Sequence, residues 1–220
     1  MLAEWLASSD NALFTSGILG SHSSIIELGC GISALTGLTV APLVSRYILT
    51  DQPYVAKLVE QNLEENRPIP TRQPAKPARK AKSRAESCSS GNVGFVPLDW
   101  EADEPAPSLT GSPDIRSFDA VIACDCIYND ALVQPLVQTC IDICRLRAVD
   151  TPEASRPCLC IVAQQLRSSE VFEAWLQAFH AAFQVWRVPD SMLIDPLRSG
   201  SGFAVHIGVL RDSLNTIRTS

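Results

Sequence analysis

The strongest constraint on the fold of this 220-residue chain is an alternation of short apolar, β-like runs with longer helix-like runs. We expect strands at residues 24–28, 47–51, 95–98, 118–124, 158–163, 184–188 and 203–210. We expect helices at residues 33–44, 53–66, 131–146 and 169–183. This alternation predicts an α/β fold, a mostly parallel sheet with helices on both faces. The last two strands have no helix between them, which predicts a terminal antiparallel hairpin.

Length and composition fit one folded domain. The chain is 46% hydrophobic and 19% charged, and its length is enough for a single substantial core. No apolar run reaches the roughly 18 residues that a membrane span needs. Residues 1–5 lack the basic start and apolar core of a secretory signal. Since nothing in the composition demands an oligomer, we expect a monomeric single domain, 1–220, in the cytosol or nucleus.

Residues 67–92 interrupt the alternation. They are rich in Pro, Lys, Ser and Ala, with almost no large apolar side chains, which predicts a disordered insertion. Their part 67–84 holds seven Lys/Arg and no acid. Without these seven, 11 basic residues stand against 24 acidic ones, and the remaining net charge is −13. An acidic body favours a basic protein partner over direct nucleic-acid binding, unless the basic segment itself makes the nucleic-acid contact.

The eight cysteines do not follow a metal-binding or disulfide pattern. No two are spaced as C-x-x-C, and the three histidines are scattered singly. Cys124 and Cys126 fall in one apolar run and Cys158 and Cys160 in another, where a spacing of two places both side chains on one face of a strand. We expect buried free thiols acting as small hydrophobic groups, with no metal and no disulfide.

The segment Gly29-Cys30-Gly31, directly after the first predicted strand, is the first candidate site. Glycines at a strand-to-helix turn let the backbone pass close to a bound nucleotide. Asp51 ends the second strand, where a carboxylate can accept two hydrogen bonds from ribose hydroxyls. A tight turn without a ligand and a helix cap at Asp51 are the alternative interpretations. Together the two features predict an adenosine-type ligand, either NAD or S-adenosylmethionine.

The third and fourth predicted strands are followed by further candidates. Trp100 comes just after the third strand, where an indole can lie against an adenine ring. Residues 124–129 close the fourth strand, and binding sites in such sheets lie at the carboxyl ends of strands. Asp125 and Tyr128 are predicted to face that crevice, whereas a capping Asp and a packed Tyr are the structural alternative. Trp100 and the segment with Asp125 and Tyr128 favour S-adenosylmethionine over NAD as the ligand.

Four motifs together resemble one family, the family 16 seven-β-strand S-adenosylmethionine-dependent methyltransferases. They are ELGCG at 27–31, TD at 50–51, LDW at 98–100 and DCIY at 125–128, the last matching that family's D-x-x-Y motif. Stretches at 2–6, 163–165 and 172–176 add to the likeness, which covers nearly the whole chain outside 67–92. Within the family, the sequence is most similar to fungal ribosomal-protein lysine methyltransferases.

The resemblance implies a Rossmann-like class I methyltransferase that transfers a methyl group from S-adenosylmethionine to a protein lysine, with a ribosomal protein as the expected substrate. It implies catalytic or orienting roles for Asp125 and Tyr128. It implies cofactor contacts from Glu27, Gly29, Cys30, Gly31, Asp51, Trp100 and the backbone of Cys124. Family members usually carry an N-terminal region with a cofactor-contacting tryptophan, which is expected upstream of the part that this chain matches.

Three other functions stay open from the sequence. A small-molecule or nucleic-acid methyltransferase would share the cofactor site. An NAD-dependent oxidoreductase would need a catalytic His, Lys or Tyr-Lys pair near the nicotinamide, and none is evident. A catalytically silent module that binds the cofactor is the third alternative.

Overall fold

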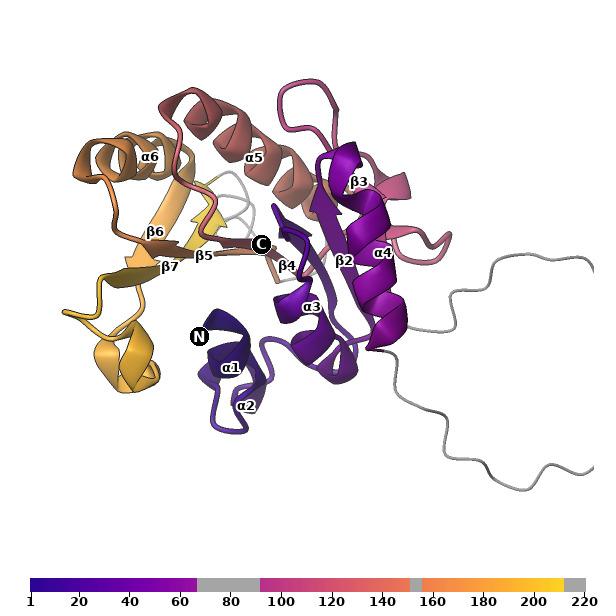
Figure 1. Ribbon diagram of the computed structural model, residues 1–220, viewed down its shortest axis with the longest axis horizontal. Helices are drawn as coiled ribbons and strands as arrows, with labels where there is room; N and C mark the ends of the chain where they lie inside the picture. The colour runs from indigo at the N-terminus through magenta and orange to yellow at the C-terminus, as the bar shows by residue number, and fades with distance from the viewer. Residues whose placement is uncertain (67–91, 151–155, 212–220) are drawn as a thin grey trace, which may run out of the picture.

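The computed structural model describes residues 1–66, 92–150 and 156–211 (Figure 1). Within these residues one seven-stranded sheet has the order β3-β2-β1-β4-β5-β7-β6. The strands are β1 (Ser24–Leu28), β2 (Arg46–Asp51), β3 (Val93–Pro97), β4 (Ala120–Cys124), β5 (Leu159–Gln165), β6 (Phe183–Arg187) and β7 (Phe203–Leu210). Strands β1 to β5 pair in parallel, whereas β7 pairs antiparallel with both β5 and β6. The predicted mostly parallel sheet with a terminal hairpin is confirmed.

Helices cover both faces of the sheet, as predicted (Figure 1). They are α1 (Leu2–Ala7), α2 (Ala12–Thr15), α3 (Leu35–Val40), α4 (Ala56–Glu65), α5 (Val133–Asp150) and α6 (Ser169–Ala182). Short 3-10 turns cover residues 41–43, 53–55, 107–110, 130–132, 190–192 and 195–197. Helices α1, α3 and α4 pack on one face, and α5 and α6 pack on the other. None of the described helices is both long enough and apolar enough to span a bilayer.

Strand β1 shows why both faces need covering. Ile25 packs with the core under α1 and α3, and Ile26 and Leu28 pack with the core under α5 and α6. Successive side chains of a strand point to opposite faces, so an unbroken apolar run buries both faces of a central parallel strand. All five residues of β1 are buried. The sheet is therefore a rigid base for whatever its carboxyl-terminal edge carries.

Several element boundaries differ from the predicted ones. The helix predicted at 33–44 begins at Leu35, because Ala34 has a left-handed backbone (φ 51°) that cannot continue into a helix. Strand β5 continues to Gln165, two residues beyond its predicted end, and pairs there with Phe203. Helices α1 and α2 were not predicted, because six and four residues are too few to show a helical period.

The amino-terminal helices are fixed to the domain by specific contacts. The Trp5 indole donates to the carbonyl of Met192 (2.6 Å). The buried Asn11 side chain donates to the carbonyl of Trp5 (2.8 Å) and accepts from the N–H of Leu13, which caps α2. The segment thus packs against α3 and the turn at 190–192.

The predicted insertion at 67–92 lies, apart from Asn92, outside the described residues, so its predicted disorder stays a prediction. Asn92 donates from its amide to the carbonyls of Ala41 and Val44, the latter at 2.7 Å. It therefore belongs to the folded part, at the start of β3.

The cysteine prediction is confirmed for one pair and wrong for the other. Cys158 and Cys160 share the core under α5. Cys124 and Cys126, however, face opposite sides of the sheet, because the residue between them, Asp125, has a left-handed backbone (φ 58°) that ends the strand. The described cysteines are all free thiols.

Candidate functional site

The turn after β1 brings the backbone close to its neighbours. Gly29 and Gly31 both have positive φ angles, 65° and 62°, which favour glycine. A Cβ on Gly29 would lie 2.8 Å from the Cys126 Sγ and 3.3 Å from the Trp100 ring, so only glycine fits there. A Cβ on Gly31 would meet nothing within 4 Å. The turn is packed tightly beneath Gly29 and open above Gly31.

Asp51, the last residue of β2, faces this turn. One of its carboxylate oxygens accepts the N–H of Gly31 (2.8 Å), and the other accepts the N–H of Gln52 (2.7 Å). Each carboxylate oxygen has two lone pairs, so both can accept a further hydrogen bond. The glycine turn and this carboxylate, which the sequence analysis combined as one candidate site, are thus in direct contact.

Trp100 follows β3 and lies half-buried against Gly29. Its indole N–H is buried and has no acceptor among the described residues. Buried donors are nearly always paired in folded proteins, so this N–H can serve an acceptor on a ligand. Trp100 therefore places an apolar ring in the same region as Asp51, and its buried N–H has no acceptor among the described residues.

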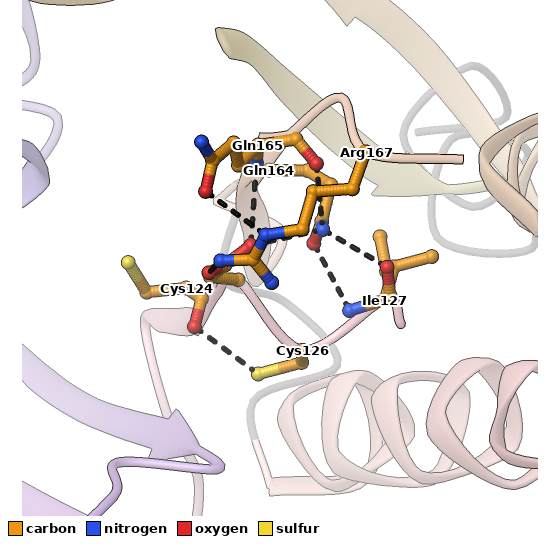
Figure 2. A network of polar contacts seen from close by, with 7 residues as sticks. Cys124, Cys126, Ile127, Gln164, Gln165 and Arg167 are labelled. Carbon is orange, nitrogen blue, oxygen red and sulfur yellow. Dashed lines mark hydrogen bonds and ion pairs between the residues drawn. The ribbon is translucent and has the colours of Figure 1, made fainter. Parts of the chain in front are cut away.

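The turn after β4 brings Asp125 and Tyr128 to the same end of the sheet. Asp125 is held by β5 and its following loop: one carboxylate oxygen accepts from the Gln164 amide (3.0 Å) and the other pairs with Arg167. Figure 2 shows the hydrogen bonds between Gln164 and Ile127 that hold the same turn. Tyr128 is 64% exposed. This four-residue turn therefore carries one carboxylate that is held in place, Asp125, and one aromatic side chain that is mostly exposed, Tyr128.

These residues line one cavity of about 290 Å³, a small ligand-sized volume. Its walls come from four strand ends and the segments that follow them. They are formed by Gly29, Gly31, Ile32, Asp51, Gln52, Tyr54, Val55, Leu98, Asp99, Trp100, Asp125, Cys126, Tyr128 and Leu132. The charged side chains among these residues are all acids, so the cavity favours a cationic ligand.

Three predicted site residues, Glu27, Cys30 and Cys124, are not among the residues that line the cavity. Glu27 is buried under the turn and accepts from the hydroxyl of Tyr47 (2.9 Å). Burial raises the pKa of Glu27 to about 7, against the lowering effect of its hydrogen bond to Tyr47. The side chains of Cys30 and Cys124 lie on the same face as Glu27, and burial raises the pKa of both thiols. These three side chains support the turns from behind.

Other residues at this site were not predicted. Tyr54 and Gln52 line the cavity after Asp51, but an exposed tyrosine in a turn carries no sequence pattern. Gln164 at the end of β5 and Arg167 just after it contact Asp125, although they are about 40 residues away in the sequence. The polar Gln164 at the end of an apolar run was the one available signal. In the described residues no group of three or more metal-ligand side chains is suited to an ion.

The sheet order and the glycine turn facing a carboxylate define a Rossmann-like class I methyltransferase fold. The fold is shared with N-methyltransferase NodS from Bradyrhizobium japonicum, in complex with S-adenosyl-L-homocysteine, at a TM-score of 0.53 and 12% identity, over 96% of this chain and 86% of that one. The pyocyanin biosynthetic protein PhzM matches at a TM-score of 0.51 and 11% identity, over 91% of this chain and 53% of that one. Such low identities show the fold alone.

Residues 1–176 match the profile of the lysine methyltransferase family, and the chain belongs to that family. The resemblance stated from the four sequence motifs is thereby confirmed. Because this match covers the glycine turn, Asp51, Trp100 and the turn at 125–128, the whole cavity lies within the family region.

Relatives from fungi match over most of this chain. Ribosomal lysine N-methyltransferase 5 of Zygosaccharomyces rouxii is 29% identical over 80% of this chain and 56% of its own length. The protein of that name from Eremothecium gossypii is 26% identical over 70% of this chain and 48% of its own length. Diaminohydroxyphosphoribosylamino-pyrimidine deaminase of Schizosaccharomyces pombe is 27% identical over 76% of this chain and 33% of its own length. The chain thus spans a third to just over half of these relatives.

Proposed function

We propose that this chain is an S-adenosylmethionine-dependent protein-lysine N-methyltransferase. The observation that carries the proposal is the convergence of two different turns on one cavity. The glycine turn with Asp51 and Trp100 forms one side, and the turn with Asp125 and Tyr128 forms the other. Family membership supports the same assignment.

The first side fits the cofactor. Asp51 has free lone pairs for two ribose hydroxyls, and Gly31 leaves open space where a side chain would otherwise stand. Trp100 offers a ring face to an adenine and an N–H without an acceptor. S-adenosylmethionine, when bound, supplies the methyl group as a sulfonium electrophile. The first side therefore binds the cofactor, whereas the acceptor lysine is bound by the second side.

The second side fits a lysine. A free lysine side chain has a pKa near 10.4, so the amine must lose a proton before it attacks a methyl group. Asp125 can accept a hydrogen bond from the incoming amine, or from a water that takes the proton. Tyr128 shapes the entrance beside it. Orientation of the amine is the main task that these residues would perform.

A ribosomal or translation-related protein is the proposed substrate. Two of the relatives carry the name ribosomal lysine N-methyltransferase 5. The acidic cavity, and the net charge of −13 outside the seven basic residues of 67–84, favour a basic protein partner over direct contact with nucleic acid. We further propose a monomer that works in the cytosol or nucleus.

The test is incubation of the chain with S-adenosylmethionine carrying a labelled methyl group and a fungal ribosome extract. We expect one labelled protein band, with the label recovered as methylated lysine after acid hydrolysis. Asp51→Ala, at a cofactor concentration below the wild-type Kd, should lose that band. Label in the RNA or small-molecule fraction instead would support a methyltransferase for another substrate class.

A further inference from the structure

The side chain of Gln164 is a buried amide at the end of β5 that lies outside the cavity lining. It is 2% exposed, although glutamine is mostly found at protein surfaces. Burying an amide costs free energy unless its donors and acceptor are paired. Gln164 has no contact with the cavity that would explain its burial, so its bonds to the neighbouring chain are the relevant feature.

Those bonds hold the turn that follows β4. The Gln164 Oε1 accepts the N–H of Ile127 (3.0 Å), and its Nε2 donates to the carbonyl of Ile127 (2.9 Å). The same Nε2 donates to a carboxylate oxygen of Asp125 (3.0 Å) and lies 3.1 Å from the carbonyl of Gln165. The Gln164 side chain thus pairs the N–H and the carbonyl of Ile127, as a neighbouring strand would, and also bonds the side chain of Asp125.

The turn needs such support because its backbone is strained. Asp125 has a φ of 58°, a left-handed conformation that non-glycine residues rarely adopt. Its own N–H donates to the carbonyl of Ala163 (2.8 Å), and its carboxylate is also approached by the N–H of Gln165 (3.4 Å) and by Arg167. All these partners come from the end of β5 and the residues just after it. The position of the Asp125 carboxylate is therefore set from β5.

We propose that Gln164 is a positioning residue for methyl transfer: its amide fixes the Asp125 carboxylate and the 125–128 turn in the orientation that receives the acceptor amine. This inference rests on the proposed function. The oxygen of Asp125 that bonds Gln164 is also approached by the Gln165 N–H, whereas the second oxygen has Arg167 as its partner among the described residues, so a lone pair of that second oxygen stays available for the amine. Arg167 holds the second oxygen from an exposed position and contributes less.

The first test is Gln164→Leu, which keeps a similar volume and removes every bond. We expect kcat on a lysine-bearing protein substrate to fall roughly 10²-fold, since small misplacements of a reacting group have effects of that size. The Kd for S-adenosyl-L-homocysteine, measured by calorimetry, should stay within about three-fold, because Gln164 does not line the cavity. Ile161→Ala, a buried β5 substitution on the opposite core, controls for general destabilisation. A kcat equal to that of this control would overturn the proposal.

Gln164→Glu gives a signature that a purely structural residue would not give. An ionised carboxylate beside Asp125 repels it, whereas a protonated one can again donate to it. The ratio of variant to wild-type kcat should therefore rise as pH falls from 8.5 to 6, although lysine methylation itself slows. A flat ratio over this range would count against the positioning role.

A third measurement does not depend on activity. The Ile127 N–H is bonded to Gln164, so its hydrogen exchange should speed up about ten-fold in Gln164→Leu, and not in Ile161→Ala. If the wild-type chain methylates no lysine, the proposed function fails, while the exchange result still decides whether Gln164 fixes the turn. Unchanged exchange at Ile127 would refute that part directly.

Discussion

The two sides of the cavity are built by different means. The cofactor side consists of a glycine turn and a carboxylate that bonds directly to it, Gly31 to Asp51, at adjacent strand ends. The acceptor side consists of a strained turn whose key side chain, Asp125, is held by Gln164 from β5 and by Arg167 from the segment after β5. The cofactor side is thus defined mainly by backbone shape, and the acceptor side by a network of side chains. Substitutions on the two sides should therefore have separable effects.

The largest separation is expected for Asp125→Asn. Turnover on a protein substrate should fall about 10²-fold or more, the effect of losing a positioned charged group at the reacting centre. Cofactor affinity should stay within a few-fold, because the cofactor side is intact. Steady-state kinetics and calorimetry check the two effects, and Tyr128→Ala should give a smaller loss. Near-full activity of Asp125→Asn would mean that the motif at 125–128 is only a structural cap.

Asp51→Ala should give the opposite pattern. Loss of hydrogen bonds from a charged acceptor should weaken S-adenosylmethionine binding by roughly 1.5–3 kcal/mol. At saturating cofactor, kcat should remain near the wild-type value. Asp130→Ala, an exposed acid near the acceptor side, is the matched control and should leave the Kd unchanged. An unaltered Kd in Asp51→Ala would remove this residue from the cofactor site.

Gly29→Ala tests whether the cofactor side depends on close backbone packing. The added Cβ would have both an unfavourable positive φ and a 2.8 Å contact with the Cys126 Sγ, which together should cost about 2–3 kcal/mol of stability. Gly17→Ala has a similar φ (70°) but nothing within 4 Å, so it should cost only about 1 kcal/mol. Urea unfolding of the two variants measures the difference. Equal losses would mean that packing at Gly29 is looser than described.

Glu27 should make the stability of the domain depend on pH. Its pKa in the folded state, about 7, lies above the ordinary 4.5, so the folded state binds more protons than the unfolded state between these values. Stability should therefore fall as pH rises, by about 2 kcal/mol from pH 5 to pH 7. Glu27→Gln should flatten this part of the profile, whereas Glu60→Gln, on the exposed side of α4, should not. Chemical denaturation at a series of pH values provides the comparison.

The smallest effect is expected for Arg167→Gln. The Arg167 side chain is 54% exposed, and exposed ion pairs contribute little. Turnover should fall by less than about five-fold, provided that Gln164 still holds Asp125. A loss as large as that of Gln164→Leu would shift the positioning role from the buried amide to the guanidinium.

The sequence predicts the cofactor side of the cavity better than the acceptor side. Gly29, Gly31, Asp51 and Trp100 stand at strand ends, where local motifs and the β/α alternation place them, and all four line the cavity. The buried role of Glu27 was missed, because a motif does not show which face of a strand each side chain takes.

The acceptor side was only half predictable. Asp125 and Tyr128 follow a recognisable motif, and both line the cavity. Gln164 and Arg167 were missed because their contacts join residues about 40 positions apart, and no local pattern encodes such a pairing. The left-handed backbone of Asp125 also escaped prediction, since non-glycine residues rarely adopt it. The prediction that Cys126 shares a face with Cys124 was wrong because of this single bend in the backbone at Asp125.

The bend at Asp125 also limits how this site could be moved. Moving residues 125–128 alone onto another parallel sheet would transfer the side chains without the conformation, because the β5 end holds the turn. The smallest portable unit is the tetrapeptide together with Ala163, Gln164 and Gln165 on the adjoining strand. A design that keeps that pair of strand ends in register would keep the orientation of the carboxylate.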